Sequence, residues 1–306
     1  MKRDFVNFED LSRDEVLEIL DYAFYIKKNP FANNILKNKS IGLIFMKQST
    51  RTRLSFEVGV KHLGGQPIYI LGSSTQLSRG EDIKDTARVM SRYLDGIVIR
   101  TYSHQEVEDL ARYGNVPVIN ALTDYQHPCQ VLADLQTIKE RFGKLEGLKL
   151  TYIGDGNNMA NTLLIACSMM GINISVATPP MYEPNGKAIK TALDFAKETG
   201  VNIEITNNPE EAVKESDILY TDVWVSMGQE NESNKKNVFE GFTINKNLLS
   251  KANKNAIVMH CLPAHKGEEI TEEVFEMFAD IIFDQAENRL HAQKSLLNFL
   301  YKGGSN

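Results

Sequence analysis

Residues 41–65 read IGLIFMKQSTRTRLSFEVGVKHLGG, an apolar run followed by a polar turn and a second, periodic segment. Its apolar start, residues 41–46, is typical of a buried strand. Phe56, Val60 and Leu63 then keep helical spacing until a glycine pair ends the helix. A strand that leads directly into a helix is the repeating unit of parallel α/β sheets, so this stretch predicts that class.

The same alternation continues to the end of the chain. The expected strands cover residues 41–46, 67–71, 95–100, 116–120, 148–154, 172–178, 201–205, 217–221, 255–260 and 280–283. The expected helices cover residues 52–63, 82–93, 104–113, 129–142, 157–170, 185–199, 209–215, 245–253, 271–278 and 287–301. Near-continuous apolar strands indicate sheets covered on both faces, so we predict two doubly wound parallel-sheet domains. The helix at 129–142 joins them, dividing the chain into 1–142 and 143–285.

Composition excludes several function classes. The 306 residues are 42% hydrophobic and 24% charged, which is typical of a soluble globular protein. No run of about 18 apolar residues is present, and the N-terminal residues lack a secretory signal, so we expect a cytoplasmic protein with no membrane segment. A net charge of −6 argues against nucleic acid as a partner. An anionic substrate would therefore need a local basic cluster.

The cysteines indicate neither a disulfide framework nor a metal centre. Cys129, Cys167 and Cys261 are odd in number and widely spaced, as expected for reduced thiols in a cytosolic compartment. No spacing of Cys and His matches a zinc site, so no metal is predicted.

The clearest candidate site begins at Ser49-Thr50-Arg51-Thr52-Arg53, between the first strand and its helix. A helix N-terminus offers N–H groups and a partial positive charge to an anion. Hydroxyls and guanidinium groups in the same turn suit phosphate, although no Walker lysine is present. Taken alone, the cluster could also be a capped surface helix with solvated arginines.

Further polar residues follow other strands, at the sheet edge where ligands bind. Arg100 ends the third strand, and His127-Pro128-Cys129-Gln130 opens the helix that joins the domains. A lone arginine there is often a surface residue, and a His before Pro is often a structural turn. Beside an anion site, however, His127 becomes a candidate donor to a developing oxyanion.

The turn at residues 152–159, Tyr-Ile-Gly-Asp-Gly-Asn-Asn-Met, resembles a dinucleotide fingerprint. Met159 occupies the position of the third glycine, and the next strand ends without the acidic residue that would hold a ribose. Nicotinamide binding is therefore disfavoured, and Asn158 could instead hold a small polar ligand.

Two motifs follow later strands. The first, residues 222–228, supplies the carboxylate of Asp222, which suits an ammonium group, although a simple loop is the alternative. The second is His260-Cys261-Leu262-Pro263, in which Cys261 could be reactive or merely small; no partner base is identifiable. Arg289 lies early in the last helix and could close the site from the second half.

Together these residues resemble the ornithine carbamoyltransferases of the aspartate/ornithine carbamoyltransferase family, over essentially the whole chain. The Ser-Thr-Arg-Thr-Arg and His-Pro-Cys-Gln motifs are shared with the aspartate branch and specify only carbamoyl phosphate. The Ser226-Met227-Gly228 and His260-Cys261-Leu262-Pro263 motifs are specific to the ornithine branch.

The resemblance implies transfer of the carbamoyl group of carbamoyl phosphate to the δ-amine of L-ornithine, with no metal or organic cofactor. It implies a homotrimer or an assembly of trimers, in which Gln76 reaches a neighbour's site, and a C-terminal helix (286–306) that returns to the first domain. The implied carbamoyl-phosphate residues are Ser49, Thr50, Arg51, Thr52, Gln76, Arg100, His127, Pro128, Cys129, Gln130, Cys261, Leu262 and Arg289. The implied ornithine residues are Asn158, Asp222, Ser226 and Met227, and the implied catalytic residues are Arg100, His127, Cys261 and Asp222.

Three alternatives stay open at this point. A carbamoyltransferase for another amine, such as putrescine or an acylated ornithine, would share the phosphate chemistry. An NAD-dependent oxidoreductase would belong to a different enzyme class. A non-catalytic binding protein could retain the fold alone.

Overall fold

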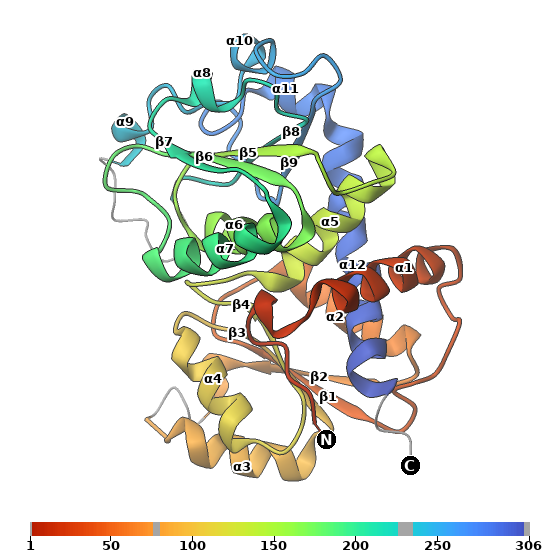
Figure 1. Ribbon diagram of the computed structural model, residues 1–306. Helices are drawn as coiled ribbons and strands as arrows, with labels where there is room; N and C mark the ends of the chain where they lie inside the picture. The colour runs from red at the N-terminus through yellow and green to blue at the C-terminus, as the bar shows by residue number, and fades with distance from the viewer. Residues whose placement is uncertain (1, 76–79, 226–234, 303–306) are drawn as a thin grey trace. The chain divides into compact units, whose positions relative to one another are not determined.

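A computed structural model describes residues 2–75, 80–225 and 235–302 of the chain (Figure 1). The chain divides into two compact units. The first comprises residues 1–136 and 287–306, and the second comprises residues 137–286. The boundaries fall inside two long helices, α5 (Pro128–Phe142) and α12 (Ala279–Tyr301).

The first unit contains a four-stranded parallel sheet in the order β2-β1-β3-β4. The strands are β1 (Ser40–Phe45), β2 (Gln66–Leu71), β3 (Gly96–Arg100) and β4 (Val118–Leu122). The helices are α1 (Arg13–Lys28), α2 (Thr50–His62), α3 (Ile83–Tyr93) and α4 (His104–Tyr113), with short 3-10 turns at Phe8–Asp10 and Gly72–Ser74. Figure 1 shows α3 and α4 on one face of this sheet and α1, α2 and the last part of α12 on the other.

The second unit contains a five-stranded parallel sheet in the order β7-β6-β5-β8-β9. The strands are β5 (Lys149–Ile153), β6 (Asn173–Ala177), β7 (Ile203–Thr206), β8 (Ile218–Thr221) and β9 (Ile257–His260). The helices are α6 (Asn158–Met170), α7 (Gly186–Thr199), α8 (Pro209–Ala212), α9 (Lys235–Val238), α10 (Lys246–Leu249) and α11 (Glu272–Met277). Figure 1 shows α6 and α7 on one face, with α8, α10 and α11 on the other.

Burial of the strands explains the doubly wound arrangement. Every residue of β3, β4, β8 and β9 is buried, which requires cover on both faces of each sheet. The predicted fold class is therefore confirmed. Within the described residues, no helix is long and apolar enough to cross a membrane.

One predicted element is wrong. Residues 280–283 are not a strand but the start of α12, which begins at Ala279. The run Ile281-Ile282-Phe283 suggests a strand, yet burial follows a helical period, because Ile282 and Gln285 are buried while Phe283 is 56% exposed. The amide of Ile282 donates to the carbonyl of Phe278, so α12 follows directly from α11.

Candidate active site

The turn between β1 and α2 presents the predicted phosphate residues. Ser49 is the N-cap of α2, and its hydroxyl accepts a hydrogen bond from the backbone N–H of Thr52 at 3.2 Å. The helix therefore begins at Thr50, so Thr50 and Arg51 occupy its first turn. No acidic residue is present in that turn. The positive end of the helix dipole is thus left for an external anion.

Arg289 connects three elements of the first unit. From α12, its Nη1 donates to Oε1 of Gln130 at 2.6 Å, and its Nη2 donates to the hydroxyl of Thr52 at 3.1 Å. Its Nε donates to Gln293 at 2.8 Å, and the side chain is almost fully buried. The expectation that Arg289 closes the site from the second half is wrong, because α12 has already entered the first unit at Glu287.

His127 lies in a cationic environment. Burial lowers its pKa well below the usual value of 6.5, and the positive charges of Arg289, Arg100 and Arg51 lower it further. The imidazole is therefore neutral at pH 7. A neutral imidazole can donate one hydrogen bond to a carbonyl oxygen without losing a proton. Three arginines around one neutral donor form a site suited to an anion with a polar carbonyl.

The residues after His127 differ in their roles. Pro128 is the first residue of α5, where its missing N–H has no consequence. The thiol of Cys129 is fully buried and donates to the backbone carbonyl of Asn120 at 3.3 Å. Burial raises the pKa of Cys129 to about 12, so the thiol stays protonated. Gln130, in contrast, contacts Arg289 through its oxygen and Asp134 through its amide group at 2.9 Å.

Arg53 does not share the arrangement of Arg51. Its guanidinium stacks on the ring of Tyr69 at 3.8 Å from the centroid, and its Nε lies 3.2 Å from Glu57. These contacts argue against a role for Arg53 as a second phosphate fork. A helix places residues i and i+4 on one face, and the ion pair with Glu57 holds Arg53 on that face.

In the second unit, Asp222 is the centre of a polar cluster. It follows β8 and is 8% exposed. Its Oδ1 accepts hydrogen bonds from the Val223 amide at 2.8 Å and from the Cys261 thiol at 2.9 Å. Its Oδ2 accepts from the side-chain amide of Asn157 at 2.9 Å. The carboxylate is thus held by three donors, and Cys261 has the acidic neighbour that the sequence alone did not identify.

Asn157 is a positioning residue that the sequence reasoning missed. Its oxygen caps α6 by accepting from the backbone amides of Met159 and Ala160, while its NH₂ group holds Asp222. The available signal was an Asn immediately before an apolar helix. The predicted ligand residue Asn158 is next to it, at the first position of α6 and half-buried.

Packing, and not dinucleotide binding, explains the glycine at position 156. A Cβ on Gly156 would lie 2.3 Å from the carbonyl oxygen of Tyr182 and 2.5 Å from the nitrogen of Pro184. Only glycine permits this approach of the chain at 182–184.

His260 and Glu269 stabilise the loop that begins at Cys261. Both side chains are fully buried, and His260 Nε2 lies 3.0 Å from Oε1 of Glu269. The backbone N–H of Leu262 donates to Nδ1 of His260 at 2.8 Å, so Nδ1 carries no proton and Nε2 is the donor to Glu269. Leu262 has a φ of 58°, a conformation that this hydrogen bond helps to hold. Gln285 accepts from the His260 amide at 3.0 Å and completes the support.

Three predicted residues, Gln76, Ser226 and Met227, lie outside the described residues.

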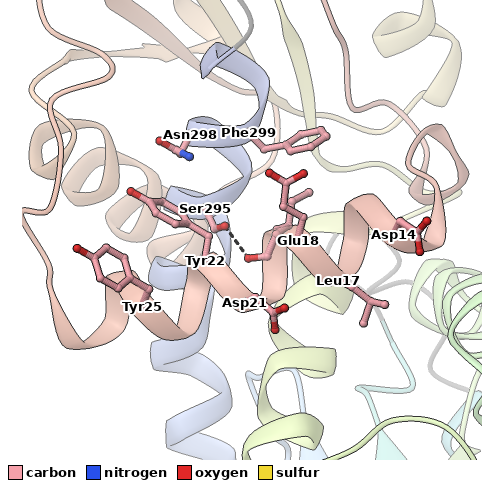
Figure 2. A pocket seen from close by; sticks show the side chains of 10 residues that line it. Asp14, Leu17, Glu18, Asp21, Tyr22, Tyr25, Ser295, Asn298 and Phe299 are labelled. Atoms are coloured by element: carbon pink, nitrogen blue, oxygen red, sulfur yellow. Dashed lines mark hydrogen bonds between the residues drawn. The ribbon is translucent and has the colours of Figure 1, made fainter.

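A separate groove lies between α1 and α12 in the first unit (Figure 2). Its volume is about 570 Å³, and it is lined by Asp14, Leu17, Glu18, Ile19, Asp21, Tyr22, Tyr25, Ser295, Asn298 and Phe299. Three of these side chains are acidic, so the groove is poorly suited to an anionic substrate. Glu18 forms an ion pair with Lys302, and Ser295 donates to the carbonyl of Ile19. We therefore assign no catalytic role to it.

Comparison with known proteins identifies the family. Residues 3–140 match the carbamoyl-P binding domain of aspartate/ornithine carbamoyltransferase, and residues 146–300 match its Asp/Orn binding domain. The chain belongs to the aspartate/ornithine carbamoyltransferase family.

Relatives within that family are similar over nearly their full lengths. An ornithine carbamoyltransferase of Aquifex aeolicus is 51% identical over 304 residues, which is 99% of each chain. One of Bacillus cereus is 51% identical over 98% of this chain and 95% of its own. The solved ornithine carbamoyltransferase of Pyrococcus furiosus is 47% identical, with a TM-score of 0.94 over 100% of this chain and 98% of that one. The anabolic enzyme of Campylobacter jejuni is 43% identical, with a TM-score of 0.94 over 99% and 100%.

Proposed function

We propose that this carbamoyltransferase moves the carbamoyl group of carbamoyl phosphate to the δ-amine of L-ornithine, yielding L-citrulline and phosphate. The observation that carries the proposal is the similarity over nearly the whole chain to relatives named ornithine carbamoyltransferase, at 51% identity. The two polar clusters support it chemically. The first unit concentrates positive charge, and the second presents a carboxylate beside a thiol.

In the first unit, carbamoyl phosphate binds with its phosphate at the N-terminus of α2. Ser49, Thr50, Arg51 and Thr52 hold that phosphate. Attack by an amine places negative charge on the carbamoyl oxygen, and Arg100, His127 and Thr52 stabilise this charge, while Gln130 binds the carbamoyl amide. Loss of one such donor typically costs ~10²–10³ in rate. Arg289 acts here by fixing Gln130 and Thr52 through its own hydrogen bonds.

In the second unit, Asp222 binds the amino end of ornithine, with Asn158, Ser226 and Met227 as further contacts. An alkyl amine has a pKa of about 10 in water, so the reactive form must lose a proton before it attacks. Cys261 donates to this carboxylate, and exclusion of water when both substrates are bound would favour the neutral amine. Asp222 orients the amine, and its carboxylate has the chemistry of a proton acceptor.

We also propose a homotrimer in the cytoplasm. Support comes from exposed apolar side chains on α2 and on β2, the edge strand of the first sheet. Leu54 is 54% exposed, Val58 36%, Ile68 39% and Leu71 43%. Burial of these side chains against a second copy of the chain would remove apolar surface from water. Light scattering on the purified protein is expected to give the mass of three chains or a multiple of it, and the mass of a single chain would contradict the proposal.

The test of the activity compares four amines in parallel. Purified protein is incubated with carbamoyl phosphate and ornithine, putrescine, N-acetylornithine or aspartate, and the carbamoylated product is measured. We expect strong activity with ornithine alone. Higher activity with putrescine would retain the carbamoyl-phosphate half of the proposal and overturn its amine half. No product with any amine from a folded protein would overturn both.

A further inference from the structure

Three side chains outside the predicted site meet at the carboxyl edge of the first sheet. Lys47, Tyr102 and Asp124 each lie two residues beyond the end of a strand, after β1, β3 and β4 respectively. The Nζ of Lys47 lies 2.5 Å from Oδ1 of Asp124 and 4.1 Å from the ring centroid of Tyr102. One ammonium group therefore connects three neighbouring loops.

The burial of Lys47 makes this contact energetically important. Its side chain is only 7% exposed, whereas that of Asp124 is 62% exposed. A buried ammonium group must be paired, because an uncompensated charge away from water is strongly unfavourable. The ring of Tyr102 adds a cation–π contact on a second side. Both contacts hold the lysine in one place.

The same three loops carry the proposed carbamoyl-phosphate residues. The loop after β1 leads from Lys47 to Ser49 and the first turn of α2, β3 ends at Arg100, and the loop after β4 leads from Asp124 to His127. Backbone hydrogen bonds already join these loops. The amide of Met46 donates to the Arg100 carbonyl, and the amide of Asp124 donates to the Tyr102 carbonyl, both at 2.9 Å.

We propose that Lys47 is a positioning residue for carbamoyl-phosphate use, and that its ion pair with Asp124 fixes the phosphate turn relative to the loop that carries His127. This inference rests on the proposed function. Lys47 acts through the loops and not by contact with substrate, since its ammonium group is directed to Asp124 and Tyr102. A displacement of about 1 Å in a catalytic group can cost about 100-fold in rate. An ion pair that holds these loops in place therefore affects catalysis.

The opposite edge of the same sheet offers a control with the same residue types around a more exposed lysine, Lys39, whose side chain is 37% exposed. Lys39 precedes β1, Asp95 precedes β3, and Tyr301 lies in α12, which gives the same three residue types. The Nζ of Lys39 lies 4.0 Å from Asp95 and 5.7 Å from the ring centroid of Tyr301. The amino edge carries none of the proposed ligand residues, so the Lys39–Asp95 pair has no expected part in substrate binding.

The experiment compares Lys47→Met with Lys39→Met in citrulline formation at varied carbamoyl phosphate and saturating ornithine. For Lys47→Met we expect kcat/KM for carbamoyl phosphate to fall about 10- to 100-fold. Lys47→Arg restores most of it, because arginine can pair with Asp124 and stack on Tyr102. Lys39→Met stays within about twofold of the original protein, because exposed pairs contribute little.

Asp124→Asn is the second variant, because Asp124 is exposed enough for the substitution to leave folding intact. It should lower kcat/KM for carbamoyl phosphate in the same direction as Lys47→Met. If Lys47→Met or Asp124→Asn retains kcat/KM within twofold, or if Lys39→Met loses as much, the inference is overturned. Failure of the proposed function is a separate result, because the unaltered protein would then form no citrulline.

Discussion

The two polar clusters of this carbamoyltransferase are built in opposite ways. In the first unit, Arg51, Arg100 and Arg289 place three positive charges around a buried neutral histidine. In the second unit, a single carboxylate, Asp222, already accepts hydrogen bonds from three donors. In the first cluster like charges lie close together, so a bound anion lowers its electrostatic energy. The second is satisfied within the protein and is ready for a cationic or neutral amine.

Each cluster is therefore complementary in charge to one proposed substrate. Like charges held close together repel, and a bound dianion offsets that repulsion. Ligand binding should therefore stabilise the first unit more than the second.

Arg51→Ala should have the largest effect. The substitution removes one of the three charges that act on His127 and one side chain from the first turn of α2. We expect kcat/KM for carbamoyl phosphate to fall by ~10²–10³, with a thermal midpoint close to that of the original protein. Steady-state kinetics and circular dichroism measure the two quantities. Normal turnover by the variant would end the phosphate assignment of Arg51.

Asp222→Asn should act on the other substrate. The asparagine can still accept hydrogen bonds but lacks the negative charge that holds an ammonium group. We expect kcat/KM for ornithine to fall about 10- to 100-fold, because hydrogen bonds to charged groups contribute roughly 1.5–3 kcal/mol. The KM for carbamoyl phosphate should change little. An unchanged response to ornithine would show that the carboxylate has another role.

Glu269→Leu should show how far the second cluster depends on its buried support. The substitution leaves Nε2 of His260 and the amide of His265 without an acceptor. A buried donor left unsatisfied costs about 1–3 kcal/mol, so thermal stability should fall, and ornithine use should weaken with it. Glu269→Gln is the matched control, because its amide oxygen can accept the same hydrogen bonds. Equal loss in both variants would mean that charge, and not the acceptor, matters.

The lowered pKa of His127 predicts a dependence of stability on pH. Its folded-state pKa lies well below the unfolded value of about 6.5, so below pH 6.5 the unfolded chain binds a proton that the folded protein does not. The free energy of unfolding should therefore decrease as pH falls from 6.5, by up to about 1.4 kcal/mol per pH unit for this group. His127→Gln should make that decrease shallower in urea unfolding at pH 7.5, 6.0 and 5.0. An equally steep decrease would contradict the assignment.

Arg53→Ala should have the smallest effect. Its guanidinium contacts Tyr69 and Glu57, and an exposed pair at i,i+4 contributes about 0.3–0.5 kcal/mol. We expect carbamoyl-phosphate kinetics within about twofold of the original protein. A loss comparable with that of Arg51→Ala would show that both arginines bind phosphate.

The sequence predicted most of the fold because most strands are short apolar runs that a polar turn separates from the next helix. It failed at residues 280–283, where an apolar run of three residues is too short to distinguish a strand from the first turn of α12. Helix α1 was not predicted, although Ser12 and Glu15 form a capping box at its start.

Candidate site residues could be named from the sequence because, within each sheet, the motifs follow strands whose carboxyl ends lie at the same edge. The family prediction is confirmed by the comparisons. The direction of individual side chains could not be predicted from the sequence. Arg51 and Arg53 are two residues apart in one motif, yet only Arg51 acts on His127. The contacts of Asn157 with Asp222 and of Lys47 with Asp124 join residues 65 and 77 positions apart, which no local pattern encodes.

The most direct test of the division between the two clusters is binding of carbamoyl phosphate alone, measured by calorimetry in three proteins. The original protein, Arg51→Ala and Asp222→Asn are titrated without ornithine. We predict that Arg51→Ala weakens binding by at least about tenfold, whereas Asp222→Asn binds as tightly as the original protein. Equal weakening in both variants would contradict this division, because carbamoyl phosphate would then depend on the carboxylate of the second unit as much as on the arginines of the first.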